Sequence, residues 1–195
     1  MTSIRNRKRI RMASLLLVAG TLAGVSACTS DDPAEGKPSN AAPTPAGRQS
    51  SAAADPTDTA KREALTTYAT YWREMSRSYS KGSSKETSLK DYAAGAALAG
   101  ADAGMKNMRK AGQITVGQVK VGASTVTQID MSGRIPNAKL SSCLDVSQWV
   151  VTDRNTRKPV ALPSDRLTKY VVVSVVEKWP EGWRVIRDEP QEDSC

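Results

Sequence analysis

The sequence YVVVSVVEKWPEGWRVIR, residues 170–187, has the pattern of a β-hairpin. Two runs rich in β-branched residues, 170–178 and 183–187, flank the tetrapeptide WPEG at 179–182. Proline presets one turn dihedral and glycine can adopt a positive φ, so this tetrapeptide suits a short connection between antiparallel strands. The hairpin therefore predicts an antiparallel sheet in the C-terminal part of the chain.

Earlier segments extend this sheet. After Gly112, β-branched residues alternate with small or polar ones, which is typical of strands. Turn signals follow at 133–137 and at 153–155, where glycine, proline, asparagine and aspartate gather. We expect strands within 114–121, 126–129, 138–146 and 148–152, ahead of the hairpin.

The segment before Gly112 has a helical period instead. Asp58 is placed to cap a helix over 59–80. Apolar residues recur along this helix at steps of three and four: Leu65, Tyr68, Trp72, Met75 and Tyr79. A second, Ala/Gly-rich stretch over 87–111 predicts a short helix followed by a longer one. Because helices precede antiparallel strands, the expected fold class is α+β, with the helices packed on one face of a strongly bent sheet.

The N-terminus has the features of an export signal. Five basic residues and no acid precede an uncharged stretch from Ala13 to Val25, and small residues then lead to Cys28. The arrangement resembles a bacterial lipoprotein signal, which implies a signal peptide over 1–27 and lipid attachment at Cys28. A transmembrane span is disfavoured, because thirteen helical residues extend only about 20 Å. An ordinary secretory signal is the alternative.

Residues 28–58 are predicted to be a disordered tether. Five prolines lie there among alanine, serine, threonine, glycine and aspartate, with no aromatic residue. Such a composition cannot bury enough apolar surface to offset the entropy of ordering. The folded domain is therefore expected over 59–195.

Cysteine usage fits an exported chain. If Cys28 is acylated, Cys143 and Cys195 remain as an even pair, and exported thiols are usually oxidised. We expect a Cys143–Cys195 disulfide that stabilises the domain by about 4 kcal/mol. Two free buried thiols are the alternative.

Charge and composition exclude several function classes. The formal charge is +8, but residues 1–27 hold five of the 28 basic residues and no acid, so the remainder carries +3. The sequence has no basic stripe with interleaved aromatic residues, so nucleic-acid binding is not expected. The absence of histidine rules out Ser-His-Asp and Cys-His catalysis and disfavours a zinc site. No cofactor or metal is predicted.

Several short segments carry a further resemblance: Tyr71-Trp72, the run from Tyr92 to Leu98, Cys143-Leu144-Asp145 and Gly182-Trp183-Arg184-Val185. Through these segments, residues 59–195 resemble exported actinobacterial lipoproteins with an NTF2-like, or SnoaL-like, cone fold. The resemblance implies a cone that encloses a pocket, which relatives use for proton-transfer chemistry on small apolar substrates.

Two hypotheses follow for such a pocket. Asp130 and Asp145 lie within strand patterns and are the candidate general bases of an isomerase- or cyclase-type enzyme. Aromatic residues could instead line a binding cavity, or simply form the core of a chain without phenylalanine: Tyr71, Trp72, Tyr92, Trp149 and Trp183. Trp179, at the hairpin turn, is a candidate for contact with lipid or a protein partner.

The expected function is that of a membrane-anchored lipoprotein on the extracytoplasmic face of the cell membrane. It would act as a non-catalytic binding or accessory module for a small apolar ligand or a cell-envelope protein. The cone-fold enzyme is the alternative.

Overall fold

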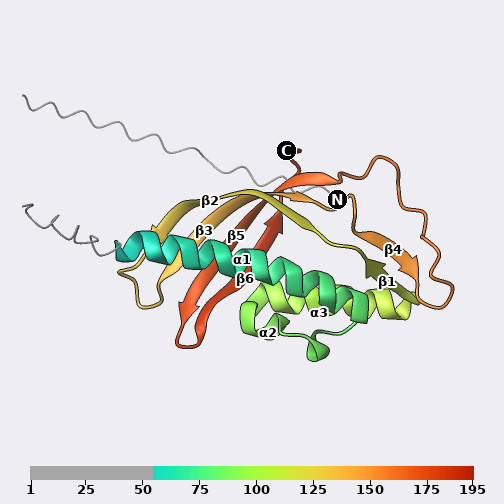
Figure 1. Cartoon of the computed structure of the whole chain (residues 1–195), viewed down its shortest axis with the longest axis horizontal. Helices are drawn as coiled ribbons and strands as arrows, with labels where there is room; N and C mark the ends of the chain where they lie inside the picture. The colour runs from blue at the N-terminus through green and yellow to red at the C-terminus, as the bar shows by residue number, and fades with distance from the viewer. Residues whose placement is uncertain (1–54) are drawn as a thin grey trace, which may run out of the picture. The chain divides into compact units, whose positions relative to one another are not determined.

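The computed structural model describes residues 55–195, which form an α+β fold with helices first and antiparallel strands after them (Figure 1). The helices are α1 (Pro56–Lys81), the 3-10 helix η1 (Ser84–Glu86), α2 (Leu89–Tyr92) and α3 (Gly95–Lys110). The predicted α+β class and the division of the second helical stretch are confirmed. The signal peptide, the Cys28 attachment site and the tether up to residue 54 lie outside the described residues.

Helix α1 begins three residues earlier than predicted, so Asp58 is not its cap. The side chain of Asp55 accepts a hydrogen bond from the Thr57 amide at 2.7 Å, and Pro56 occupies the first helical position. Proline is favoured there because its missing N–H would have no intrahelical partner. Asp58 lies in the first turn and pairs with Lys61 at 3.0 Å.

Six strands form two antiparallel sheets. The larger sheet has the order β2-β3-β5-β6, built from β2 (Lys120–Asp130), β3 (Asn137–Asp145), β5 (Lys169–Trp179) and β6 (Gly182–Pro190). The smaller sheet pairs β1 (Gln113–Val116) with β4 (Val150–Asp153). The hairpin expected from residues 170–187 is therefore confirmed as β5 and β6.

Helix α1 lies across one face of the larger sheet, and α3 runs beside it next to β6 (Figure 1). Even-numbered residues of β3 and β5 face this layer and form the core with the aromatic stripe of α1: Tyr68, Tyr71, Trp72, Leu140, Leu144, Val172 and Val176. Tyr68, Tyr71 and Trp72 of α1 are therefore core residues.

A β-bulge in β6 changes which side chains face the core. Val176 pairs with Val185 and Val175 pairs with Arg187, so Ile186 is an extra residue in β6. Before the bulge Trp183 and Val185 are buried, whereas after it Asp188 lies on the inward face opposite Ser174. A bulge shifts the alternation of a strand by one residue, which here turns a carboxylate inward.

Cys143 and Cys195 form a disulfide with a Cα–Cα distance of 5.8 Å. The predicted pairing is confirmed, and the two-thiol alternative is wrong. The bond joins β3 to the segment after β6, where the Val171 amide also donates to the Asp193 carbonyl at 2.9 Å. Residues 191–193 therefore continue the pairing of β6 along β5, and the disulfide ties the end of this segment to β3.

None of the helices within residues 55–195 has both the length and the apolar composition needed to cross a membrane.

Candidate functional site

An apolar pocket of about 290 Å³ lies where the two sheets meet α1. We call it the aromatic pocket. Tyr79 comes from α1 and Tyr170 from β5, and the connection between β4 and β5 forms one wall. The complete lining is Tyr79, Thr115, Val146, Trp149, Val151, Leu162, Arg166, Leu167 and Tyr170.

The backbone fixes the walls of this pocket. Val146 donates its amide to the Thr168 carbonyl at 2.8 Å, and Val160 donates to the Val151 carbonyl at 2.9 Å. These bonds tie the β4–β5 connection to both sides of the pocket. Leu162 and Leu167 are nevertheless 40% and 46% exposed. The rim therefore presents apolar side chains to incoming molecules.

Two lining residues bury polar atoms that have no hydrogen-bond partner within residues 55–195: the Thr115 hydroxyl and the Trp149 indole nitrogen. Buried polar groups are nearly always paired, and an unpaired one costs about 1–3 kcal/mol. Neither atom has accessible surface, so the surface that the pocket presents to a ligand is mainly apolar.

The structure separates the five aromatic residues predicted to line one cavity. Trp149 lines the aromatic pocket, and its ring lies 5.0 Å from Tyr79 and 6.3 Å from Trp72. Tyr71 and Trp72 are buried in the core, and Tyr92 packs against that core. Trp183 is also buried, and its indole donates to Glu63 at 3.0 Å. The aromatic-core interpretation therefore holds for four of the five residues.

Asp130 and Asp145 are not in apolar surroundings, so the premise for their role as general bases is wrong. Asp130 accepts hydrogen bonds from Ser132 and Gly133 in the β2–β3 turn, and these lower the pKa of its carboxyl. Hydrogen bonds from Ser147, assisted by Lys169 at 3.5 Å, lower the pKa of Asp145. Both side chains are ionised turn residues at strand ends.

Asp188 is a carboxylate that the fold turns toward the core, and the sequence analysis missed it. Ser174 donates to one oxygen at 2.6 Å, and the Tyr71 hydroxyl lies 3.5 Å from the other. Burial raises the pKa of Asp188 to about 6, although hydrogen bonds from Ser174, Tyr68 and Tyr71 oppose the shift. Nearby, Ser142 donates to the Tyr68 hydroxyl at 2.8 Å. Asp188 is thus one end of a buried hydroxyl network and is absent from the lining of the aromatic pocket.

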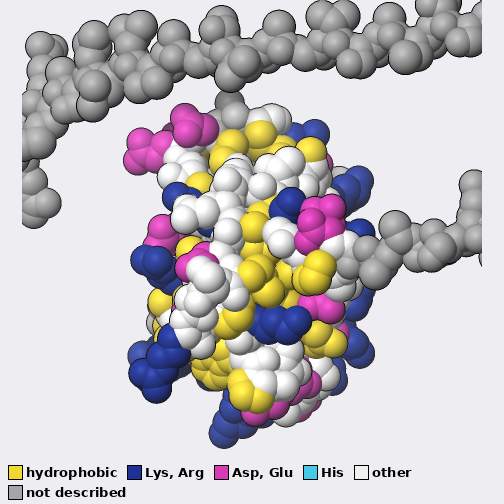
Figure 2. All heavy atoms as spheres, turned by 90° about the vertical axis from the view of Figure 1, so that its left-hand side faces the viewer, with side chains coloured by type: hydrophobic (Ala, Val, Ile, Leu, Met, Phe, Trp, Pro, Cys, Tyr) yellow, Lys and Arg dark blue, Asp and Glu magenta, His cyan; other side chains and the backbone are white. Residues whose placement is uncertain are grey.

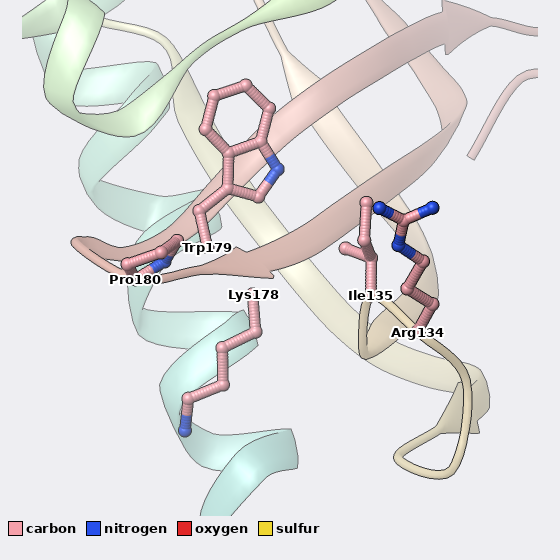
Figure 3. Close-up of a pocket in the computed structure, with 5 residues that line it drawn as sticks. All are labelled: Arg134, Ile135, Lys178, Trp179 and Pro180. Carbon is pink, nitrogen blue, oxygen red and sulfur yellow. The ribbon is translucent and has the colours of Figure 1, made fainter.

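The predicted contact residue Trp179 lines another hollow, of about 480 Å³, at the far end of the sheet. Figure 3 shows Trp179 and Pro180 of the β5–β6 hairpin across from Arg134 and Ile135 of the β2–β3 loop, with Lys178 pointing away from them. The Trp179 indole donates to Glu177 at 3.0 Å, and Arg184 lies 5.0 Å from the ring centre. Trp179 is therefore half-buried and already engaged.

This end of the molecule faces the viewer in Figure 2, where hydrophobic side chains gather at the centre and charges of both signs surround them. Lys178 pairs with Glu63 of α1 at 3.0 Å, so not every cation near the hollow is free to attract an anion. The mixed charge gives this end no strong preference for an anionic or a cationic partner. Contact of Trp179 with lipid or protein stays a prediction.

Within residues 55–195 no group of three or more cysteine, aspartate or glutamate side chains is arranged to hold a metal ion.

No protein-family model matches the chain, and no curated protein matches it. Among solved structures, the fold is similar to the intermembrane space region of the chloroplast protein ARC6, with a TM-score of 0.48 and 11% sequence identity. The match covers 69% of this chain and 97% of that one.

Proposed function

We propose that this protein is a lipid-anchored, extracytoplasmic binding module that holds a small apolar ligand in the aromatic pocket. The observation that carries the proposal is the apolar lining of this pocket, with Leu162 and Leu167 exposed at its rim. The ligand would therefore be predominantly apolar. At about 290 Å³, the pocket suits a compact molecule at the lower end of the size range of ligand sites.

A non-catalytic role is favoured over the isomerase- or cyclase-type alternative. Asp130 and Asp145 are hydrogen-bonded turn residues, and Asp188 does not line the aromatic pocket. A general base has to come within hydrogen-bond reach of the proton it removes. None of these three carboxylates lines the pocket in which an apolar substrate would bind.

The membrane anchor and the NTF2-like cone belong to the same proposal. The anchor is supported by the basic start, the uncharged stretch and the small residues before Cys28. The cone is supported by α1 lying across a four-stranded antiparallel sheet whose strands β2 and β6 carry irregularities that bend such sheets.

Ligand binding can be tested with the hydrophobic fluorophore N-phenyl-1-naphthylamine and a matched pair of variants. Leu167 and Ile135 are both 46% exposed, but only Leu167 lines the aromatic pocket. Leu167→Asp should abolish the fluorescence increase, because it places a charge at the apolar rim, whereas Ile135→Asp should leave it intact. The pocket assignment fails if the wild-type chain does not bind the probe or if both variants lose binding equally.

The anchor requires a separate measurement. Intact mass of the protein extracted from membranes should correspond to a chain that begins at Cys28 and carries acyl groups. Cys28→Ala should release the protein from the membrane fraction. A native chain that still holds Met1, or one that begins at residue 28 with a free thiol, would refute the anchor and leave the pocket proposal standing.

A further inference from the structure

A second hollow, on the helical side of the molecule, has a different chemistry from the aromatic pocket. Its volume is about 220 Å³, roughly seven times the 30 Å³ share of a water molecule in the liquid. We call it the basic hollow. Its lining comes from η1, α2, α3 and the residue that precedes η1: Ser83, Ser84, Lys85, Lys90, Asp102, Lys106 and Arg109. The two hollows share no lining residue.

Positive charge is concentrated in the basic hollow. Four cationic side chains and one carboxylate line it, so its net formal charge is +3. Across residues 55–195, none of the four cations forms an ion pair within 4.0 Å. The one carboxylate, Asp102, is already engaged by the Ser84 hydroxyl at 2.5 Å. A concave surface lined by charge of one sign focuses its field and attracts ions of the opposite sign.

Hydrogen bonds hold part of this surface in place. Arg109 donates to the carbonyl of Gly82, which ends α1 with a left-handed φ of 72°. The Ser83 hydroxyl oxygen accepts from the Lys85 amide at 3.2 Å, which leaves the hydroxyl hydrogen free to donate to a ligand. The basic hollow therefore offers a positioned hydroxyl donor beside flexible lysines.

We propose that the basic hollow binds a phosphate group. A phosphate presents three or more acceptor oxygens and as many as two negative charges, which suits several cations and a hydroxyl donor on one concave surface. A carboxylate has two oxygens and one charge, and it would leave most of the +3 uncompensated. Dissolved phosphate compounds and the headgroups of anionic phospholipids share this chemistry.

Nuclear magnetic resonance of the full-length ¹⁵N-labelled chain in a neutral detergent tests the proposal. The probes are pyrophosphate, for dissolved phosphate, and glycerophosphoglycerol, for the soluble headgroup of a phospholipid. Amide shifts should appear at Ser83, Ser84, Lys85 and Lys106. A stronger response to glycerophosphoglycerol assigns a phospholipid headgroup, and a stronger response to pyrophosphate assigns a dissolved phosphate.

Charge-matched variants show whether the site or only the overall charge matters. The triple variant K85Q/K90Q/K106Q removes three exposed lysines of the hollow and spares Arg109, which holds Gly82. Its affinity should fall by roughly tenfold or more, because the local field is lost. The control K120Q/K139Q/K158Q removes three exposed lysines elsewhere, and it should change affinity by no more than about twofold. Equal losses in both variants, scattered shifts, or no response from the wild-type chain would overturn the proposal.

Discussion

The carboxyl group of Asp188 is held between hydroxyl groups, and no cationic group is among the causes of its shifted pKa. Its pKa of about 6 in the folded protein lies above the reference value of 3.8. The folded state therefore binds this proton more tightly than the unfolded state does. The stability that Asp188 contributes is fully present below about pH 4 and is lost as the pH rises through about 6.

We expect Asp188→Asn to remove this pH dependence, because the amide resembles the neutral acid. The free energy of unfolding of the variant minus that of wild type should increase by on the order of 2 kcal/mol from pH 4 to pH 7.5. This figure allows for the partial exposure of the side chain. Urea unfolding followed by tryptophan fluorescence at several pH values measures the difference. A difference between the two proteins that does not change with pH would contradict the prediction.

Asp145→Asn is the matched control, and its effect should have the opposite sign. Hydrogen bonds from Ser147 lower the pKa of Asp145, so its stabilising contribution is present at neutral pH and lost in acid. The variant should therefore be less stable than wild type at pH 7.5, and the gap should close as the pH falls. The same unfolding series tests both aspartates.

Sequence reasoning could not have found Asp188, for a physical reason. Extrapolating the alternation of buried Trp183 and Val185 places Arg187 on the inward face and Asp188 outside. The bulge at Ile186 reverses this assignment, and it lies where the Ala94 amide donates to the Val185 carbonyl at 2.9 Å. This contact joins segments about ninety residues apart, so no local pattern in β6 reports it.

At the scale of single elements, α3 contains three glycines, and two of them, Gly100 and Gly104, have contrasting surroundings. A Cβ built at Gly100 meets nothing within 4 Å, whereas one at Gly104 collides with the Tyr79 hydroxyl. Helix propensity favours alanine over glycine by about 1 kcal/mol at both positions. Only at Gly104 does packing oppose this preference.

We expect Gly100→Ala to raise the free energy of unfolding by as much as about 1 kcal/mol. Gly104→Ala should instead lower it by about 1–3 kcal/mol, because Tyr79 packs against Trp149 and cannot move freely. Since both aromatic rings line the aromatic pocket, Gly104→Ala should also weaken binding of N-phenyl-1-naphthylamine. Thermal unfolding and the fluorescence assay check the pair, and a stabilising effect at Gly104 would refute the close approach.

The order and type of the regular elements could be predicted because their periods are local. The hairpin turn at Trp179–Gly182 and the helical stripe of Tyr68 and Trp72 are examples. Asp55-Pro56 is also a local signal for a helix start, which makes the misplaced start of α1 an avoidable error. The aromatic pocket could be predicted only through Trp149, because Thr115 is brought to it by the pairing of β1 with the distant β4.

At the scale of the whole molecule, the disulfide closes a loop in which the two cysteines are 52 positions apart. Chain-entropy arguments assign such a cross-link about 4 kcal/mol of stabilisation. Reduction should therefore lower the free energy of unfolding of the wild-type chain by about this amount. Urea unfolding with and without dithiothreitol measures the loss. Cys143→Ser/Cys195→Ser should show no response to the reductant, and the prediction fails if reduction leaves the wild-type chain unchanged.

The same bond has a consequence for partial digestion. Arg154, Arg157 and Arg166 lie between the two cysteines in the β4–β5 connection, and Arg154 and Arg157 are exposed. Trypsin that nicks the chain there produces two fragments that stay covalently joined through sulfur. The nicked protein should migrate as one band on a non-reducing gel and separate into two pieces only after a thiol is added.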